Sequence, residues 1–153
     1  MNKVCRLLAI PALFLGLNVM SAAAEDHGCS NATLKGDYGY SVNGTSLDIP
    51  PVGPLAILGK ITLDGKGNFA GVINGSIAGN ILTDVAITGT YSIGSDCTGT
   101  VVTVYPAFTA HFTLVLIDGV EGHRQAELLS TDAGTVGTGT IKPAKFDRDC
   151  DHE

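Results

Sequence analysis

The side chains best suited to proton transfer lie in one predicted hairpin, formed by residues 108–117 and 122–131. Its first strand carries His111, and its second carries His123 and Glu127. If residues 118–120 form a three-residue turn, His111 lies opposite Glu127, and opposed side chains are about 5 Å apart. A histidine held by a carboxylate is a common arrangement of a general base and the group that orients it. The hairpin therefore offers a candidate base–orienter pair.

The same pattern is typical of an ordinary solvent-facing hairpin, because polar and apolar residues alternate on any strand with one buried face. A change of one residue in the length of the turn would also exchange the partners. Three interpretations stay open for His111, His123 and Glu127: a solvated surface, which we favour, an active site, or a pocket that orients a ligand.

Tyr38, Tyr40 and Tyr91 share a face of their predicted strands with leucine and isoleucine. This placement predicts aromatic core residues whose hydroxyls find hydrogen-bond partners. The alternative is a pocket in which these hydroxyls point at a small apolar ligand. The tyrosines therefore join the histidines and Glu127 as candidate pocket residues, and no catalytic residue is assigned.

The amino terminus holds a candidate metal ligand. Cleavage after Ala24 would place His27 third from a free amine. The amine, two amides and the imidazole could then form the square-planar nitrogen site that Cu(II) and Ni(II) prefer. No cofactor is expected, since the sequence has no Cys-x-x-Cys pair, phosphate loop or nucleophile elbow.

Strands must position all of these groups, because apolar and polar residues alternate with period two along most of the chain. Gly-rich turns separate about eight such segments, and no segment predicts a sizeable helix. A meander of this kind buries its apolar face and removes its edges by closing. We predict an all-β fold, a single closed or nearly closed antiparallel β-barrel, with an open two-sheet sandwich as the alternative.

Glycines inside the predicted strands support a strongly coiled sheet. Glycine weakens a strand unless it marks a bend or a bulge, and a closing barrel needs both. The glycines concerned are Gly36, Gly39, Gly59, Gly71, Gly75, Gly89, Gly137 and Gly139.

The turn and strand motifs within residues 31–40, 63–69 and 89–100 resemble small secreted bacterial proteins of unknown function. Those proteins are similar in architecture to the allene oxide cyclase and dirigent barrels. The likeness covers most of residues 29–142, but its motifs specify a fold, so no catalytic residue is carried over. It implies a cyclase or isomerase as an alternative function.

Residues 1–24 have the pattern of a signal peptide, with Lys3 and Arg6 before an apolar run and small residues at 22–24. The apolar run is shorter than the roughly 20 residues that span a bilayer, so we predict no membrane span. Residues 25–145 then form the barrel domain and 146–153 an acidic tail. We predict a secreted or periplasmic protein.

Removal of this leader leaves Cys29, Cys97 and Cys150, which allow three single pairings in an oxidising compartment. Cys29 and Cys97 lie in the predicted folded segment, whereas Cys150 lies in the tail. We therefore favour a Cys29–Cys97 disulfide, with Cys150 free or paired with another chain.

The charge balance excludes several partners. Lys and Arg total 9 against 15 Asp and Glu, and loss of Lys3 and Arg6 takes the net charge from -6 to -8. Such a chain has no basic stripe for nucleic acid or for an anionic membrane surface.

The preferred function is a non-catalytic secreted barrel that binds a small apolar ligand or acts as an interaction module. The alternatives are the cyclase or isomerase and a Cu/Ni-binding protein, and no oligomeric state is indicated.

Overall fold

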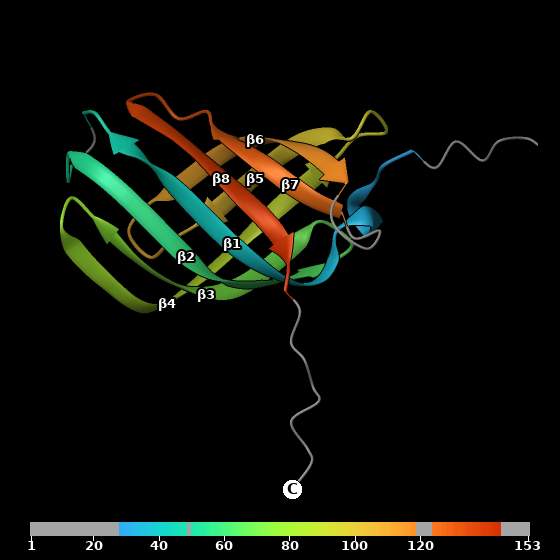
Figure 1. The fold of residues 1–153 in the computed structure, drawn as a ribbon, viewed down its shortest axis with the longest axis horizontal. Helices are drawn as coiled ribbons and strands as arrows, with labels where there is room; N and C mark the ends of the chain where they lie inside the picture. Colours follow the sequence, from blue (N-terminus) through green and yellow to red (C-terminus); the bar gives the residue numbers. More distant parts are fainter. Residues whose placement is uncertain (1–27, 49, 119–123, 145–153) are drawn as a thin grey trace, which may run out of the picture.

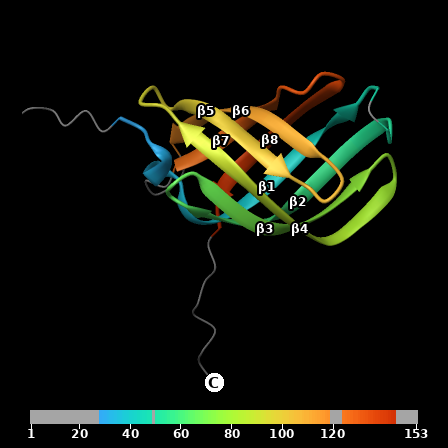
Figure 2. The ribbon, with the colours of Figure 1, turned by 180° about the vertical axis from the view of Figure 1, so that it is seen from behind.

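The computed structural model of the chain describes residues 28–48, 50–118 and 124–144. Eight strands form one closed barrel in which each strand pairs antiparallel with the next and the last pairs with the first (Figures 1 and 2). The predicted closed barrel is confirmed, and the sandwich alternative is wrong. The elements are η1 (Asn31–Thr33), β1 (Lys35–Ser46), β2 (Gly53–Asp64), β3 (Asn68–Ile77), β4 (Asn80–Ile93), β5 (Thr98–Val104), β6 (Thr109–Asp118), β7 (Arg124–Ser130) and β8 (Thr135–Pro143).

Several predictions fall outside the described residues. These are the signal peptide over 1–24, the tail over 146–153, the metal ligand His27, the pocket candidate His123 and Cys150, free or paired with another chain. All of them stay predictions. Among the residues that are described, no helix has the length and apolar character needed to cross a membrane.

The barrel interior is one contiguous cluster of apolar side chains. It forms because successive residues of a strand point to opposite faces, and the apolar residues recur at every second position. In β6, for example, Phe112, Leu114 and Leu116 are buried, whereas the residues between them are exposed. The largest fully buried side chains are Tyr40, Leu34, Ile61, Leu63, Ile73, Ile87, Leu114, Ile141, Val101 and Thr103.

Many glycines of the strands face this interior, and most of these lie opposite a large side chain of a neighbouring strand. Gly71 pairs with Ile61, and Gly89 pairs with Phe69. A Cβ atom on Gly71 would collide with the Lys60 carbonyl oxygen, and one on Gly89 with the Val102 carbonyl oxygen and the Phe69 ring. Each large side chain therefore fills the space that its glycine partner leaves. The inward-facing glycines are Gly44, Gly59, Gly71, Gly75, Gly89, Gly99, Gly137 and Gly139.

One end of the barrel is closed by η1 and the residue that follows it, Leu34, which is fully buried. The Asn31 side chain accepts a hydrogen bond from the Ile93 backbone N–H at 2.8 Å. The Tyr91 hydroxyl donates to the Leu34 carbonyl at 2.8 Å. These bonds hold the segment before β1 across the mouth of the barrel, on the side where β4 ends.

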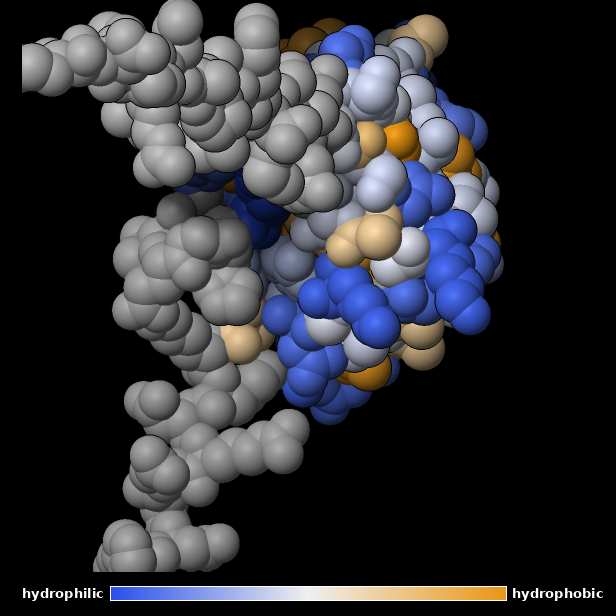
Figure 3. Space-filling model, turned by 90° about the vertical axis from the view of Figure 1, so that its right-hand side faces the viewer, coloured by the Kyte–Doolittle hydropathy of each residue, from blue (hydrophilic) through white to orange (hydrophobic). Residues whose placement is uncertain are grey.

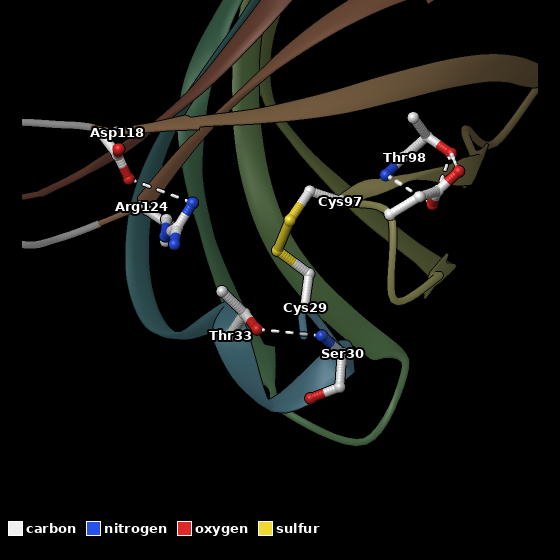
Figure 4. The surroundings of a disulfide bond; sticks show 8 residues. Cys29, Ser30, Thr33, Cys97, Thr98, Asp118 and Arg124 are labelled. Atoms are coloured by element: carbon white, nitrogen blue, oxygen red, sulfur yellow. Dashed lines mark hydrogen bonds and ion pairs between the residues drawn. A yellow bond between two sulfur atoms is a disulfide. The ribbon is translucent and has the colours of Figure 1, made fainter. Parts of the chain in front are cut away.

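The predicted Cys29–Cys97 disulfide is present at this closed end, and the two cysteines are 68 residues apart in the sequence (Figure 4). A loop of that length gives a disulfide a stabilising contribution of about 4 kcal/mol in the chain-entropy account. Such a bond is compatible with an oxidising compartment. Hydrophilic side chains predominate on the coloured part of this end (Figure 3).

Replacing an inward-facing glycine by alanine should destabilise the barrel. Gly71→Ala and Gly89→Ala each place a methyl group against the backbone of a neighbouring strand. Overpacking of this kind costs about 1–3 kcal/mol, and urea unfolding followed by circular dichroism measures it. Gly39→Ala is the matched control, since its Cβ would lie 3.8 Å from the Lys142 carbonyl oxygen, an ordinary contact. Equal free energies of unfolding for all three variants would contradict this account of the interior.

Candidate functional site

His111 and Glu127 are not partners in the structure, so the predicted base–orienter pair is wrong. Glu127 lies opposite Val115 in the β6–β7 ladder, four residues along β6 from His111. Both side chains belong to the outer face of the barrel, because Phe112 on β6 and Ala126 on β7 are the buried neighbours. The enzyme alternative therefore loses the pair on which its proton transfer depended.

The error lies in the length of the connection between β6 and β7. Strand β6 continues to Asp118 and β7 begins at Arg124, so the connection spans residues 119–123 rather than 118–120. The hydrophobic pattern fixes only which residues face inward, and a shift by an even number of residues preserves those faces. The opposed Asp118 and Arg124 form an ion pair at 3.0 Å. These opposite charges on either side of the turn were the signal in the sequence for the observed register.

His111 has a different acidic partner, Asp132, which follows β7. The Nδ1 atom of His111 lies 2.7 Å from one carboxylate oxygen of Asp132, and the His111 backbone N–H donates to the other at 2.8 Å. The Thr131 backbone N–H also donates to the His111 carbonyl. Asp132 thus fastens the turn between β7 and β8 to the start of β6.

Tyr40, one of the predicted pocket residues, lies fully inside the barrel. Its hydroxyl is 3.0 Å from the hydroxyl of Tyr105, a residue that the sequence analysis did not select. The ring of Tyr105 stacks on Phe108, with 4.4 Å between the ring centroids. The buried hydroxyl of Thr103 lies close to Tyr40 but outside hydrogen-bond geometry. Burial raises the pKa of both tyrosine hydroxyls, so they stay protonated.

Tyr38 and Tyr91 are also buried, on the side of the barrel that η1 closes. The Tyr91 hydroxyl donates to the backbone carbonyls of Asn31 and Leu34. It therefore holds the closing segment, residues 31–34, in place. Burial raises the pKa of Tyr38 and Tyr91 as well. The positions fit the aromatic core that the sequence predicted.

A groove of about 540 Å³ lies on the outer face of β1–β4. Two rows of outward-facing residues cross these strands. One row runs Asn43, Ala56, Ser76, Ile81, and the other runs Ser41, Leu58, Asn74 and the β4 bulge. The residues that line the groove are Ser41, Asn43, Ala56, Ile57, Leu58, Asn74, Gly75, Ser76, Ile81, Leu82 and Thr83.

A β-bulge in β4 lies at one side of the groove. The β3–β4 register shifts between Ile73 and Gly75, where Thr83 and Asp84 together oppose Asn74. Asp84 has a φ of 48°, and its backbone N–H donates to the Asn74 side chain at 3.0 Å. A bulge bends its strand and increases the local twist. The β3–β4 hairpin is accordingly bent toward its turn (Figures 1 and 2).

The groove combines exposed apolar side chains with uncharged polar ones. Leu58 is 66% exposed and Ile81 is 75% exposed, although both are large aliphatic residues. Asparagine, serine and threonine side chains surround them, and no lining residue is charged. Lys60, on the next outward position of β2, pairs with Asp37 at 3.2 Å. The arrangement suits an uncharged ligand with a largely apolar surface.

The described residues contain no cluster of three or more His, Cys, Asp or Glu side chains that could hold a metal ion.

No protein-family model matches the chain, and no curated protein matches it. A solved structure of a redesigned β-barrel is similar to it, with a TM-score of 0.48 and 15% sequence identity. That match covers 75% of this chain and 95% of the redesigned barrel. The likeness concerns the barrel fold alone.

The buried tyrosines predict a simple alkaline titration. All four tyrosines of the chain have a raised pKa, because burial disfavours the tyrosinate. Their contribution to stability is therefore complete below the unfolded pKa of about 10 and is lost as the pH rises above it. The near-ultraviolet absorbance of tyrosinate should rise together with unfolding, whereas urea-unfolded protein titrates near pH 10. A separate titration in the folded protein near that pH would contradict the buried placement.

Proposed function

We propose that this chain is an exported, non-catalytic binding protein, and that it takes a small uncharged apolar molecule in the outer groove of β1–β4. The observation that carries the proposal is the pair of exposed aliphatic side chains, Leu58 and Ile81, in a hollow without charged lining residues. Binding sites for small molecules are concave and mostly apolar, with volumes of about 300–1,000 Å³. The volume of the groove lies within that range.

Burial of aliphatic surface supplies the affinity in this proposal. Covering a leucine or isoleucine side chain contributes about 1.5–3 kcal/mol relative to leaving it in water. The amides of Asn43 and Asn74 and the neighbouring hydroxyls then orient the ligand through hydrogen bonds. A charged ligand would lose its hydration without gaining an ion pair, since the lining residues carry no charge.

The positions of the tyrosines, His111 and Glu127 favour binding rather than catalysis at the groove. The tyrosine hydroxyls are inside the barrel and protonated, so they offer no base to a molecule bound outside. His111 is held by Asp132 on β6, and Glu127 lies on β7, whereas the groove belongs to β1–β4. A ligand there meets amides, hydroxyls and aliphatic groups.

Export is supported by the disulfide and by the predicted leader. Cys29–Cys97 closes a long loop at the end of the barrel that η1 covers. Disulfides of this kind persist in oxidising compartments and are rare in the cytosol. We therefore place the protein outside the cytoplasm, with residues 1–24 as the signal peptide.

Nile red, an uncharged dye whose fluorescence increases in apolar surroundings, tests the groove directly. The protein should bind the dye saturably, and Leu58→Asp should weaken binding by at least about tenfold, because it places a charge in the apolar floor. Leu129→Asp is the matched control, since Leu129 is 53% exposed on β7, outside the groove. Equal dye affinity in the two variants, or loss of binding only in the control, would overturn the proposed function.

A further inference from the structure

Strand β4 extends beyond the end of β5, the strand that pairs with it on the side away from β3. Strand β5 ends at Val104, which lies opposite Thr88 of β4. Residues 80–87 of β4 pair with β3 on one side and, within the described part of the chain, have no strand on the other. The turn between β3 and β4 correspondingly extends beyond the turn between β5 and β6 (Figures 1 and 2). The barrel therefore presents a short open sheet edge.

The direction of the backbone groups along this edge follows from one hydrogen bond. The Tyr91 N–H donates to the Gly67 carbonyl, so it points toward β3. N–H groups alternate in direction along an antiparallel strand, and every second residue from Tyr91 to Val85 therefore points the same way. The N–H of Ala86 points to the open side, and Ala86 is exposed. The edge offers backbone donors and acceptors to an incoming strand.

The charge on the edge selects against a second copy of the chain. Asp84 is the one charged residue within residues 80–87. Its carboxylate forms no ion pair with the described residues. Two copies paired edge to edge would bring their Asp84 side chains near each other, and like charges across a pairing are destabilising. A charged side chain is also a common way in which proteins guard an edge against pairing with their own copies.

The same carboxylate favours a partner with a cation. We propose that β4 residues 80–87 bind an extended peptide segment of another protein, which adds a strand beside β4 where β5 has ended. The backbone of the peptide pairs with the open edge, an apolar side chain packs beside Ile81, and a lysine or arginine lies beside Asp84. Main-chain hydrogen bonds give affinity in such strand addition, and alternate side chains give selectivity.

This proposal does not depend on the ligand in the groove. Ile81 borders both surfaces, but Asp84 and Ala86 are outside the groove lining. A change at Ala86 therefore tests the edge alone, and the Leu58→Asp variant tests the groove alone. Failure of one proposal is distinguishable from failure of the other.

The test uses two synthetic peptides of alternating threonine and valine, identical except for a central lysine or glutamate. Nuclear magnetic resonance of ¹⁵N-labelled protein follows their binding at low millimolar concentration. We expect saturable shifts and slower amide exchange at Ala86 and its neighbours, with the lysine peptide binding about two- to fivefold more tightly, as for an exposed ion pair. Asp84→Asn should remove that preference, and Leu129→Asp on β7 should leave it unchanged.

Two substitutions of Ala86 distinguish strand addition from nonspecific binding of the peptide to the surface. Ala86→Pro removes the open-side N–H and should abolish peptide binding, whereas Ala86→Thr keeps that N–H and should retain it. The spectrum of each unbound variant shows whether the barrel is intact. The proposal is overturned by no saturable shift with either peptide, by equal binding to both Ala86 variants, or by shifts that depend on protein concentration without peptide. The last result would make a second copy the occupant.

Discussion

The close approach of neighbouring strands inside the barrel is the constraint on which the rest of the structure depends. At most of the inward-facing glycines the next strand comes so near that a single added carbon would collide with its backbone. A large side chain on the neighbouring strand, such as Phe69 opposite Gly89, then occupies the space inside. Small and large residues alternate around the interior in this way, which is how a small barrel is filled.

Apolar side chains gather inside the barrel, and a second set lies exposed on its outer face. Inside the barrel, the Tyr40 hydroxyl is hydrogen-bonded to Tyr105 and the Tyr91 hydroxyl to the backbone of Leu34. The exposed aliphatic residues of the groove and the open edge of β4 are instead at the surface, on the β3–β4 hairpin and its neighbours. Both surfaces arise where β4 is irregular, since the bulge at Asp84 bends the strand and β5 ends short of it.

The sequence was sufficient for the fold and for the faces of the strands, because both depend on a period of two that extends over most of the chain. It also predicted the Cys29–Cys97 pair, since these cysteines lie in the folded segment. The partner of His111 could not be obtained in this way. Its identity depends on the number of residues between β6 and β7, which no hydrophobic pattern records.

The groove was missed for a related reason. Leu58 and Ile81 read as ordinary strand residues, and only their cross-strand neighbours show that they share an outer surface. The bulge has no strong signal either, because Asp84 is a non-glycine residue with a positive φ. Aspartate adopts a positive φ more often than most non-glycine residues do, but the conformation is still uncommon for it.

The central claim is that apolar molecules meet this barrel at its outer groove rather than within its core. Methyl nuclear magnetic resonance of the protein under xenon tests it most directly, since xenon enters apolar cavities of sufficient size. The account predicts saturable shifts for the methyl groups of Leu58 and Ile81, with those of Ile61, Ile73 and Ile87 unchanged. Larger shifts for these three buried isoleucines would show a cavity inside the barrel and would contradict the account.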